Sequence, residues 1–262
     1  MKKLITFLSV ILSFFNLKTL ISFTPRKIFY ILLLSFAGFG CTRSDFNEIW
    51  IKDTPQKILI DASHDGGGWW FPQSTISGFS PSSAHQGKAL ADLLRSKGFI
   101  VEELPSKTLV TTSLLQQYSK VIRAGSFGNY QESELSAYDR FLTGKSSLFL
   151  ISDYQRPEQT DQLAEMLGID FKGIHYGNVR QYAPHAITEG AIPFSYNAGS
   201  IVENENTNSK IQILGWLDSK STLPVMGTLK HQSSKIFFLG DINGIEGVPQ
   251  PLTNNIVKWL FE

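Results

Sequence analysis

Short apolar runs alternate with amphipathic stretches along residues 57–262. Runs such as Ile58 to Ile60 are apolar on consecutive positions, as expected of strands that are buried on both faces of a parallel sheet. Stretches such as His85 to Gly98 repeat apolar residues at spacings of three and four, which predicts helices. This alternation is typical of an α/β domain in which helices connect parallel strands.

The pattern predicts the order of the elements along this domain. The expected strands are Ile58 to Ile60, Phe99 to Leu104, Lys120 to Ala124, Ser147 to Ser152 and Lys235 to Leu239. The expected helices are His85 to Gly98, Ser113 to Tyr118, Glu132 to Thr143, Thr160 to Leu167 and Asn254 to Phe261. The pattern weakens from Ile169 to Lys230, where Ile201 to Val202, Ile211 to Trp216 and Val225 to Leu229 could form an antiparallel extension.

The first forty residues read as a targeting segment. They carry five basic residues and no acidic one, and their two apolar runs are shorter than the ~20 residues of a transmembrane helix. The second run ends in small residues directly before Cys41, which resembles a bacterial lipoprotein signal. We therefore expect a leader (1–40), a tether (41–56) and one domain (57–262), with lipid on Cys41 and a place in the cell envelope. An uncleaved membrane anchor is the alternative.

Charge and cysteine content exclude several classes of function. The whole chain has 24 basic and 23 acidic residues, and without the leader 19 basic residues stand against 23 acidic ones. A mildly acidic chain gives no reason to expect nucleic acid or an anionic lipid headgroup as partner. Because Cys41 is the one cysteine in the sequence, the domain has no disulfide, no thiolate metal site and no cysteine nucleophile.

A polar loop follows the first strand of the domain. Ligands bind at the carboxyl ends of parallel strands, so this loop is the first candidate site. Its candidate ligand-binding residues are Asp61, Ser63, His64, Asp65, Trp69 and Trp70. The carboxylates and imidazole could form an acid–base cluster, or they could only cap the turn and pack. The tryptophans could stack on a sugar or contact a protein, or they could form a lid over the sheet.

Other strand ends add candidates to the same edge. Ser126 and Asn129 lie before the helix that starts near Glu132, where backbone amides can hold an anion. Asp241 follows the last strong strand. Arg123 could reach the edge or form an ion pair inside the fold. A metal would need a second histidine from elsewhere in the chain, His85 or His185, so the metal signal is weak and we expect no metal and no cofactor.

Four segments then support a family resemblance: Val121 to Gly125, Leu148 to Ser152, Pro184 to Gly190 and Ile236 to Asp241. Their order and their residues resemble the class I glutamine amidotransferase-like superfamily, in particular its trehalose-utilisation-like and uncharacterised lipoprotein branch. The resemblance implies a flavodoxin-like three-layer α/β sandwich with a mostly parallel central sheet.

The chain departs from that superfamily at the catalytic position. Amidotransferase members use a cysteine on a sharp turn after the central strand, whereas this strand ends in Ser152, Asp153 and Tyr154. We therefore expect no glutamine amidotransferase activity, and a non-catalytic domain that binds a small ligand, such as a sugar, or a protein partner. The alternatives are an envelope hydrolase acting on glycan or a small amide, with His64, Asp65 and Ser152 as catalytic candidates, and a structural subunit.

Overall fold

The computed structural model describes residues 56–64, 87–104, 107–125, 129–204, 207–244 and 251–262 of the 262-residue chain. The chain divides into two compact units, Met1–Thr54 and Pro55–Glu262, and every described residue belongs to the second. Cys41 and the expected leader lie outside the described residues. No helix in the described ranges is long and apolar enough to span a bilayer.

The main sheet of the described residues has eight strands in the order β2-β1-β3-β4-β10-β9-β8-β6. Its parallel part contains β1 (Lys57–Asp61), β2 (Ile100–Leu104), β3 (Lys120–Ala124), β4 (Ser147–Ile151) and β10 (Ser234–Leu239). Three antiparallel strands extend it: β9 (Pro224–His231), β8 (Ile211–Trp216) and β6 (Gln181–Tyr182). The parallel order is that of flavodoxin-like folds, which confirms the predicted fold class.

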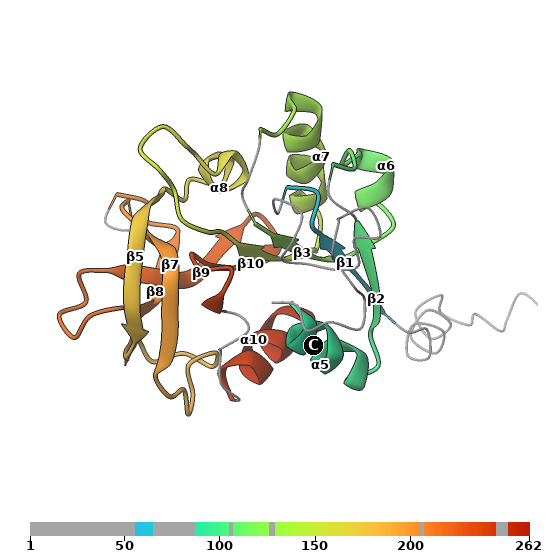
Figure 1. The fold of residues 1–262 in the computed structure, drawn as a ribbon. Helices are drawn as coiled ribbons and strands as arrows, with labels where there is room; N and C mark the ends of the chain where they lie inside the picture. Colours follow the sequence, from blue (N-terminus) through green and yellow to red (C-terminus); the bar gives the residue numbers. More distant parts are fainter. Residues whose placement is uncertain (1–55, 65–86, 105–106, 126–128, 205–206, 245–250) are drawn as a thin grey trace, which may run out of the picture. The chain divides into compact units, whose positions relative to one another are not determined.

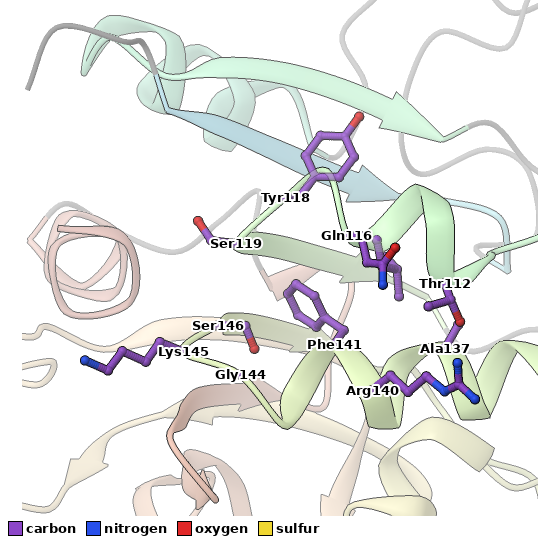
Figure 2. Close-up of a pocket in the computed structure, with 11 residues that line it drawn as sticks. Thr112, Gln116, Tyr118, Ser119, Ala137, Arg140, Phe141, Gly144, Lys145 and Ser146 are labelled. Carbon is purple, nitrogen blue, oxygen red and sulfur yellow. The ribbon is translucent and has the colours of Figure 1, made fainter. Parts of the chain in front are cut away.

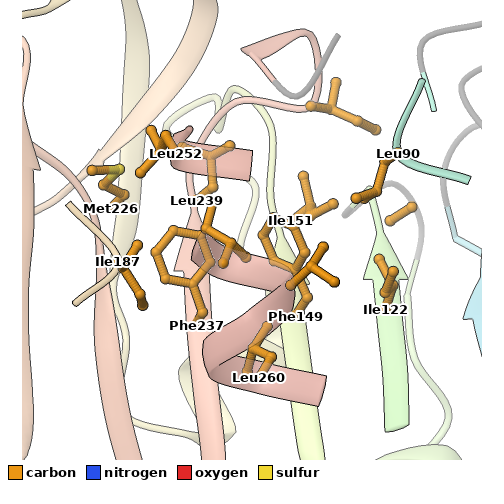
Figure 3. Packing of buried hydrophobic residues seen from close by; sticks show 14 of the residues in the cluster. Leu90, Ile122, Phe149, Ile151, Ile187, Met226, Phe237, Leu239, Leu252 and Leu260 are labelled. Atoms are coloured by element: carbon orange, nitrogen blue, oxygen red, sulfur yellow. The ribbon is translucent and has the colours of Figure 1, made fainter. Parts of the chain in front are cut away.

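Helices cover both faces of the parallel part, so the domain has three layers (Figure 1). One layer contains α6 (Thr112–Leu115), α7 (Glu132–Leu142) and α8 (Gln162–Met166). The other contains α5 (Lys88–Ser96) and α10 (Leu252–Phe261). One apolar core lies between the sheet and each helical layer. Figure 3 shows Phe149, Phe237 and Leu260 packed in the core on the α10 side.

Local sequence signals explain where the helices begin and end. The Thr111 hydroxyl accepts a hydrogen bond from the Leu114 amide and caps α6, a position that threonine favours. Gln131 and Glu134 form a capping box at the start of α7. Helix α5 stops before Gly98, which has a φ of +86° that a glycine adopts without strain.

A two-stranded antiparallel ribbon lies outside the main sheet. It consists of β5 (Phe171–Val179) and β7 (Phe194–Val202), of which the sequence pattern predicted only Ile201 to Val202 as strand. The ribbon contacts the carboxyl end of β10 very closely, because a Cβ atom on Gly199 would lie 2.6 Å from the carbonyl oxygen of Gly240. Glycine is therefore required at this contact, and the ribbon covers the end of β10.

Candidate functional site

A buried polar cluster lies at the carboxyl ends of β1, β3 and β4, on the face covered by α7 and α8. Asp61, the last residue of β1, accepts a hydrogen bond from the Ser63 amide at 2.9 Å. Its second carboxylate oxygen accepts one from the hydroxyl of Tyr138 on α7. Because Asp61 and Tyr138 are both buried, this contact fixes α7 against the end of β1.

His64 belongs to the same cluster through Tyr130 and Glu134. The imidazole stacks on the Tyr130 ring with 3.9 Å between the centroids, and its Nε2 lies 3.4 Å from Glu134 Oε1. Glu134 is only 2% exposed and accepts hydrogen bonds from the backbone amides of Val110 and Gln131. A buried carboxylate therefore orients the histidine, which suits a base as well as a purely structural contact.

Arg123, Asp161 and Ser152 form the deepest part of the cluster. Arg123 is completely buried, and its Nη2 donates to Asp161 Oδ2 at 2.6 Å. Burial acts to lower the pKa of Arg123, but the neighbouring Asp161 charge and tyrosines raise it overall. The Ser152 hydroxyl donates to the same Asp161 oxygen at 2.8 Å. Of the two roles open to Arg123, the structure shows the internal ion pair.

Three buried polar atoms in this cluster have no hydrogen-bond partner among the described residues: Ser63 Oγ, Arg123 Nε and Tyr130 Oη. Tyr130 is 7% exposed, and its hydroxyl lies within electrostatic reach of Arg123, Asp61 and Glu134. Buried polar atoms without a partner are rare in folded proteins because burial removes their hydrogen bonds to water. Because all three atoms belong to one cluster, this cluster is the candidate site of the described residues.

A second cluster surrounds Asp153 and Asp241 at the ends of β4 and β10. Asp241 accepts hydrogen bonds from the backbone amides of Asn197 and Asn243 at 2.7 and 2.8 Å. Burial raises the pKa of Asp241, although these amides offset part of the effect. Burial together with the Asp241 charge raises the pKa of Asp153 to about 7. Asp153 is therefore a buried carboxyl group that can change its charge near neutral pH.

The two clusters lie on opposite faces of the sheet. Leu59 belongs to the core on the α7 side, so Asp61, two residues later, has the same orientation. Leu239 belongs to the core on the α10 side, and Asp241 follows it in the same way. Three strand spacings separate β1 from β10, or about 14 Å. Asp61 and Asp241 thus share an edge, as expected, but belong to different clusters.

The remaining expected site residues have varied placements. Ser63 and His64 belong to the first cluster, and Asn129 is exposed directly before Tyr130. Asp65, Trp69, Trp70 and Ser126 lie outside the described residues.

Four members of the first cluster were not among the expected site residues: Tyr130, Glu134, Tyr138 and Asp161. The sequence signal for Tyr138 is its position on the apolar face of a helix, since a buried tyrosine hydroxyl usually needs a partner.

Within the described ranges, no three histidine, cysteine or acidic side chains are placed to hold a metal ion. His185 is a turn residue whose Nδ1 accepts a hydrogen bond from the Ile187 amide at 3.1 Å. Its ring packs edge-on against Trp259, whose carbonyl accepts from Lys235 at the amino end of β10. His185 and His64 therefore lie at opposite ends of the sheet.

A cavity of about 200 Å³ lies between α6 and α7, near the amino ends of β3 and β4. Leu115, Ala137 and Phe141 line much of it, while Lys145 extends away from the other lining side chains (Figure 2). This cavity is at the opposite end of the sheet from the two clusters, and its lining is largely apolar. The buried polar cluster is therefore the better candidate site.

The sequence matches no family model and no curated protein. Among solved structures, the mmIFT52 N-terminal domain matches with a TM-score of 0.58 at 14% identity, covering 78% of this chain and 94% of that one. A ThuA-like protein from Bacteroides uniformis gives 0.52 at 16% identity, with 80% and 91% covered. Cytoplasmic protein STM1381 from Salmonella typhimurium gives 0.52 at 13%, with 79% and 100% covered. The chain is thus similar in fold to ThuA-like proteins, which have the class I glutamine amidotransferase-like fold.

Proposed function

We propose that the chain is a binding domain of the trehalose-utilisation-like branch, exported to the cell envelope and anchored by lipid on Cys41. It binds a small polar ligand, a sugar by preference, at the carboxyl ends of β1 and β3, and it does not catalyse a reaction. The observation that carries this proposal is the group of buried atoms on Ser63, Arg123 and Tyr130 that have no hydrogen-bond partner in the described part of the chain. A protein partner at the same edge is the second form of the proposal.

The chemistry of the cluster supports a hydroxyl-rich ligand. A sugar hydroxyl both donates and accepts hydrogen bonds, and the cluster offers hydroxyl and guanidinium donors beside the carboxylates of Asp61 and Glu134. The His64 ring is partly accessible and lies where the chain enters the segment with Trp69 and Trp70. Aromatic side chains of that segment could stack on the apolar face of a sugar ring.

The geometry after β4 supports the absence of amidotransferase-type catalysis. A nucleophile of this kind sits on a sharp turn directly between strand and helix. Here ten residues separate the end of β4 from the start of α8 at Gln162, and Gln155 among them forms a bridge with Gly173 of the ribbon. The Ser152 hydroxyl donates to a carboxylate that already pairs with Arg123, so it is held as a structural donor.

The rival function is a hydrolase of glycan or a small amide in the envelope. The contact between His64 and the buried Glu134 favours it, because a carboxylate that orients a histidine is a common arrangement for a general base. In that case the wild-type chain would release product from a glycan or amide substrate, and His64→Ala would abolish the release while leaving the fold intact. Absence of turnover in the wild type would support the binding function.

Thermal unfolding with a panel of mono- and disaccharides and small amides tests the binding proposal. A ligand at about 100 times its Kd stabilises the folded chain by about 2.7 kcal/mol, which raises the Tm measurably. We expect at least one sugar to raise the Tm of the wild type and of a control variant, His231→Ala, at the far end of β9. His64→Ala should lose this response. A wild type that responds to no compound in the panel contradicts the proposal of a small ligand.

A further inference from the structure

Three lysines and a serine form a row across four neighbouring strands, at the amino ends of β3, β4 and β10 and at the carboxyl end of the antiparallel β9. The strand register aligns Lys120 of β3 with Ser147 of β4, Ser147 with Lys235 of β10, and Lys235 with Lys230 of β9. Side chains at one register level of a sheet have the same orientation, so all four lie on one face. This is the α10 face, because Ser147 Oγ and Lys235 Nζ donate to carbonyl oxygens of the last turn of α10.

The positive charges of this row are only partly offset inside the protein. Lys230 and Lys235 are directly opposite each other, which is an unfavourable pairing of like charges. Lys235 gains some compensation from the end of α10 and from the Trp259 ring, 5.5 Å away. Burial and the charge of Lys235 lower the pKa of Lys120. None of these three lysines forms an ion pair with a carboxylate of the described residues.

Further basic residues extend this end of the domain, which we call the basic end. Lys145 precedes β4, Lys210 precedes β8, and Lys258 lies in the last turn of α10, and all three are exposed. Lys57 and Lys97 also lie here, but Glu102 and Glu262 pair with them.

The buried carboxylates described above gather at the other end of the strands, at Asp61, Glu134, Asp153, Asp161 and Asp241. The net charge of the sequence therefore does not show that these buried carboxylates and the lysine row lie at opposite ends of the strands.

We propose that the basic end docks on a bilayer containing anionic phospholipid. The row of Lys120, Lys230 and Lys235 would face the headgroup phosphates, each lysine adding electrostatic attraction to the surface. The chain itself indicates this occupant, because β1 starts at Lys57 on the same end, and only residues 42–56 separate it from Cys41. An extended tether of that length reaches at most about 50 Å. The inference rests on the lipid anchor of the proposed function.

Docking in this orientation has a consequence for the candidate site. The amino ends of the parallel strands would face the bilayer, so their carboxyl ends would point away from it. The polar cluster around Tyr130 would then be presented to the aqueous space of the envelope, where a soluble ligand or partner can reach it.

Amine-reactive labelling of the full chain, purified from membranes and reconstituted in vesicles, tests this docking. The vesicles contain phosphatidylcholine alone or with about 30% phosphatidylglycerol, and labelling of each lysine is measured by mass spectrometry. We expect several-fold protection of Lys145, Lys230 and Lys258 in the anionic vesicles only. Lys107 and Lys220, at the other end of the strands, should be labelled equally in both. Because surface charge is screened, about 0.5 M salt should remove the protection.

Charge reversal provides the matched control. The double variant Lys230→Glu/Lys258→Glu should lose the protection of Lys145, whereas Lys107→Glu/Lys220→Glu, with the same change in net charge, should keep it. Equal labelling of the lysines at the basic end in both kinds of vesicle would refute the proposal that this end docks on the anionic bilayer.

The fraction of the chain that is recovered with each kind of vesicle tests the lipid anchor separately from the docking of the basic end. A chain recovered only with anionic vesicles contradicts the anchor and supports the docking face. A chain recovered with neither kind overturns both.

Discussion

At the scale of single residues, the Arg123–Asp161 ion pair is expected to be costly to break. Both side chains are fully buried, so removing one partner leaves an uncompensated charge in the interior. We predict that Arg123→Ala lowers the free energy of unfolding by about 3–5 kcal/mol, measured by urea denaturation. Arg95→Ala, which removes an exposed ion pair with Asp92, should cost less than about 1 kcal/mol. If Arg123→Ala lowered the free energy of unfolding as little as Arg95→Ala, the Arg123–Asp161 pair would not be a buried ion pair.

The raised pKa of Asp153 makes the stability of the folded protein depend on pH. Its folded pKa of about 7 lies above the ordinary value of 3.8, so the folded state binds the proton more tightly than the unfolded state does. The stability from this group is fully present below about pH 4 and is lost as the pH rises to about 7.

Asp153→Asn keeps an acceptor for the Tyr154 amide and removes the charge. It should therefore stabilise the protein at pH 8, by roughly 1–3 kcal/mol, and much less at pH 4. Urea unfolding curves at the two pH values measure the difference. The same effect of the variant at both would show that Asp153 titrates normally when folded.

The sequence identified some residues of the candidate site and not others. Asp61, Ser63 and His64 could be found because they follow an apolar strand directly. Glu134 and Tyr138 lie within an amphipathic helix, where their spacing reads as helix packing or capping, and only the tertiary fold brings them to Asp61 and His64. Asp161 shows the same limit, since its role depends on a long-range contact with Arg123.

At the scale of elements, the contact between the ribbon and β10 depends on glycine. A Cβ atom on Gly240 would lie 2.3 Å from the carbonyl oxygen of Ser200, and the ribbon or β10 would have to move. We predict that Gly240→Ala lowers the free energy of unfolding by at least about 2 kcal/mol in urea denaturation. Gly144→Ala is the control, since its nearest neighbour would be 3.9 Å away, and it should change stability little. Similar values for the two variants would refute the close contact.

The elements of the parallel sheet were predictable and the ribbon was not, for a physical reason. Buried strands such as Leu148 to Ile151 are apolar throughout, and this signal is strong even in a short segment. Strand β5 is mostly half-buried or exposed and contains Gly173 and Gly177, so it shows neither an apolar run nor a regular alternation.

At the scale of the whole molecule, the face of the sheet on which each side chain lies decides which residues can act together. The sequence predicts that Asp61 and Asp241 end parallel strands and hence share an edge of the sheet. It does not predict which face each side chain occupies, because strands that are apolar on both faces give no sign of their orientation. Only the packing against α7 and α10 assigns the two carboxylates to separate clusters.

The separation of charge along the strands is likewise a property of the fold. Lys120 is distant in sequence from Lys230 and Lys235, and the net acidic charge of the chain without its leader gives no sign that these lysines gather. The sheet register brings them to one row, and this row is the basis for expecting an anionic membrane surface.

The central claim is that the Tyr130 hydroxyl, which has no hydrogen-bond partner among the described residues, serves a ligand. Thermal unfolding of Tyr130→Phe, with and without a sugar that stabilises the wild type, tests it most directly. The matched variant is Tyr138→Phe, whose hydroxyl donates to Asp61 and whose loss should cost about 1–3 kcal/mol. We predict that Tyr130→Phe is as stable as the wild type without sugar and gains no stability from it. A loss as large as that of Tyr138→Phe, with an unchanged response to the sugar, would contradict the account.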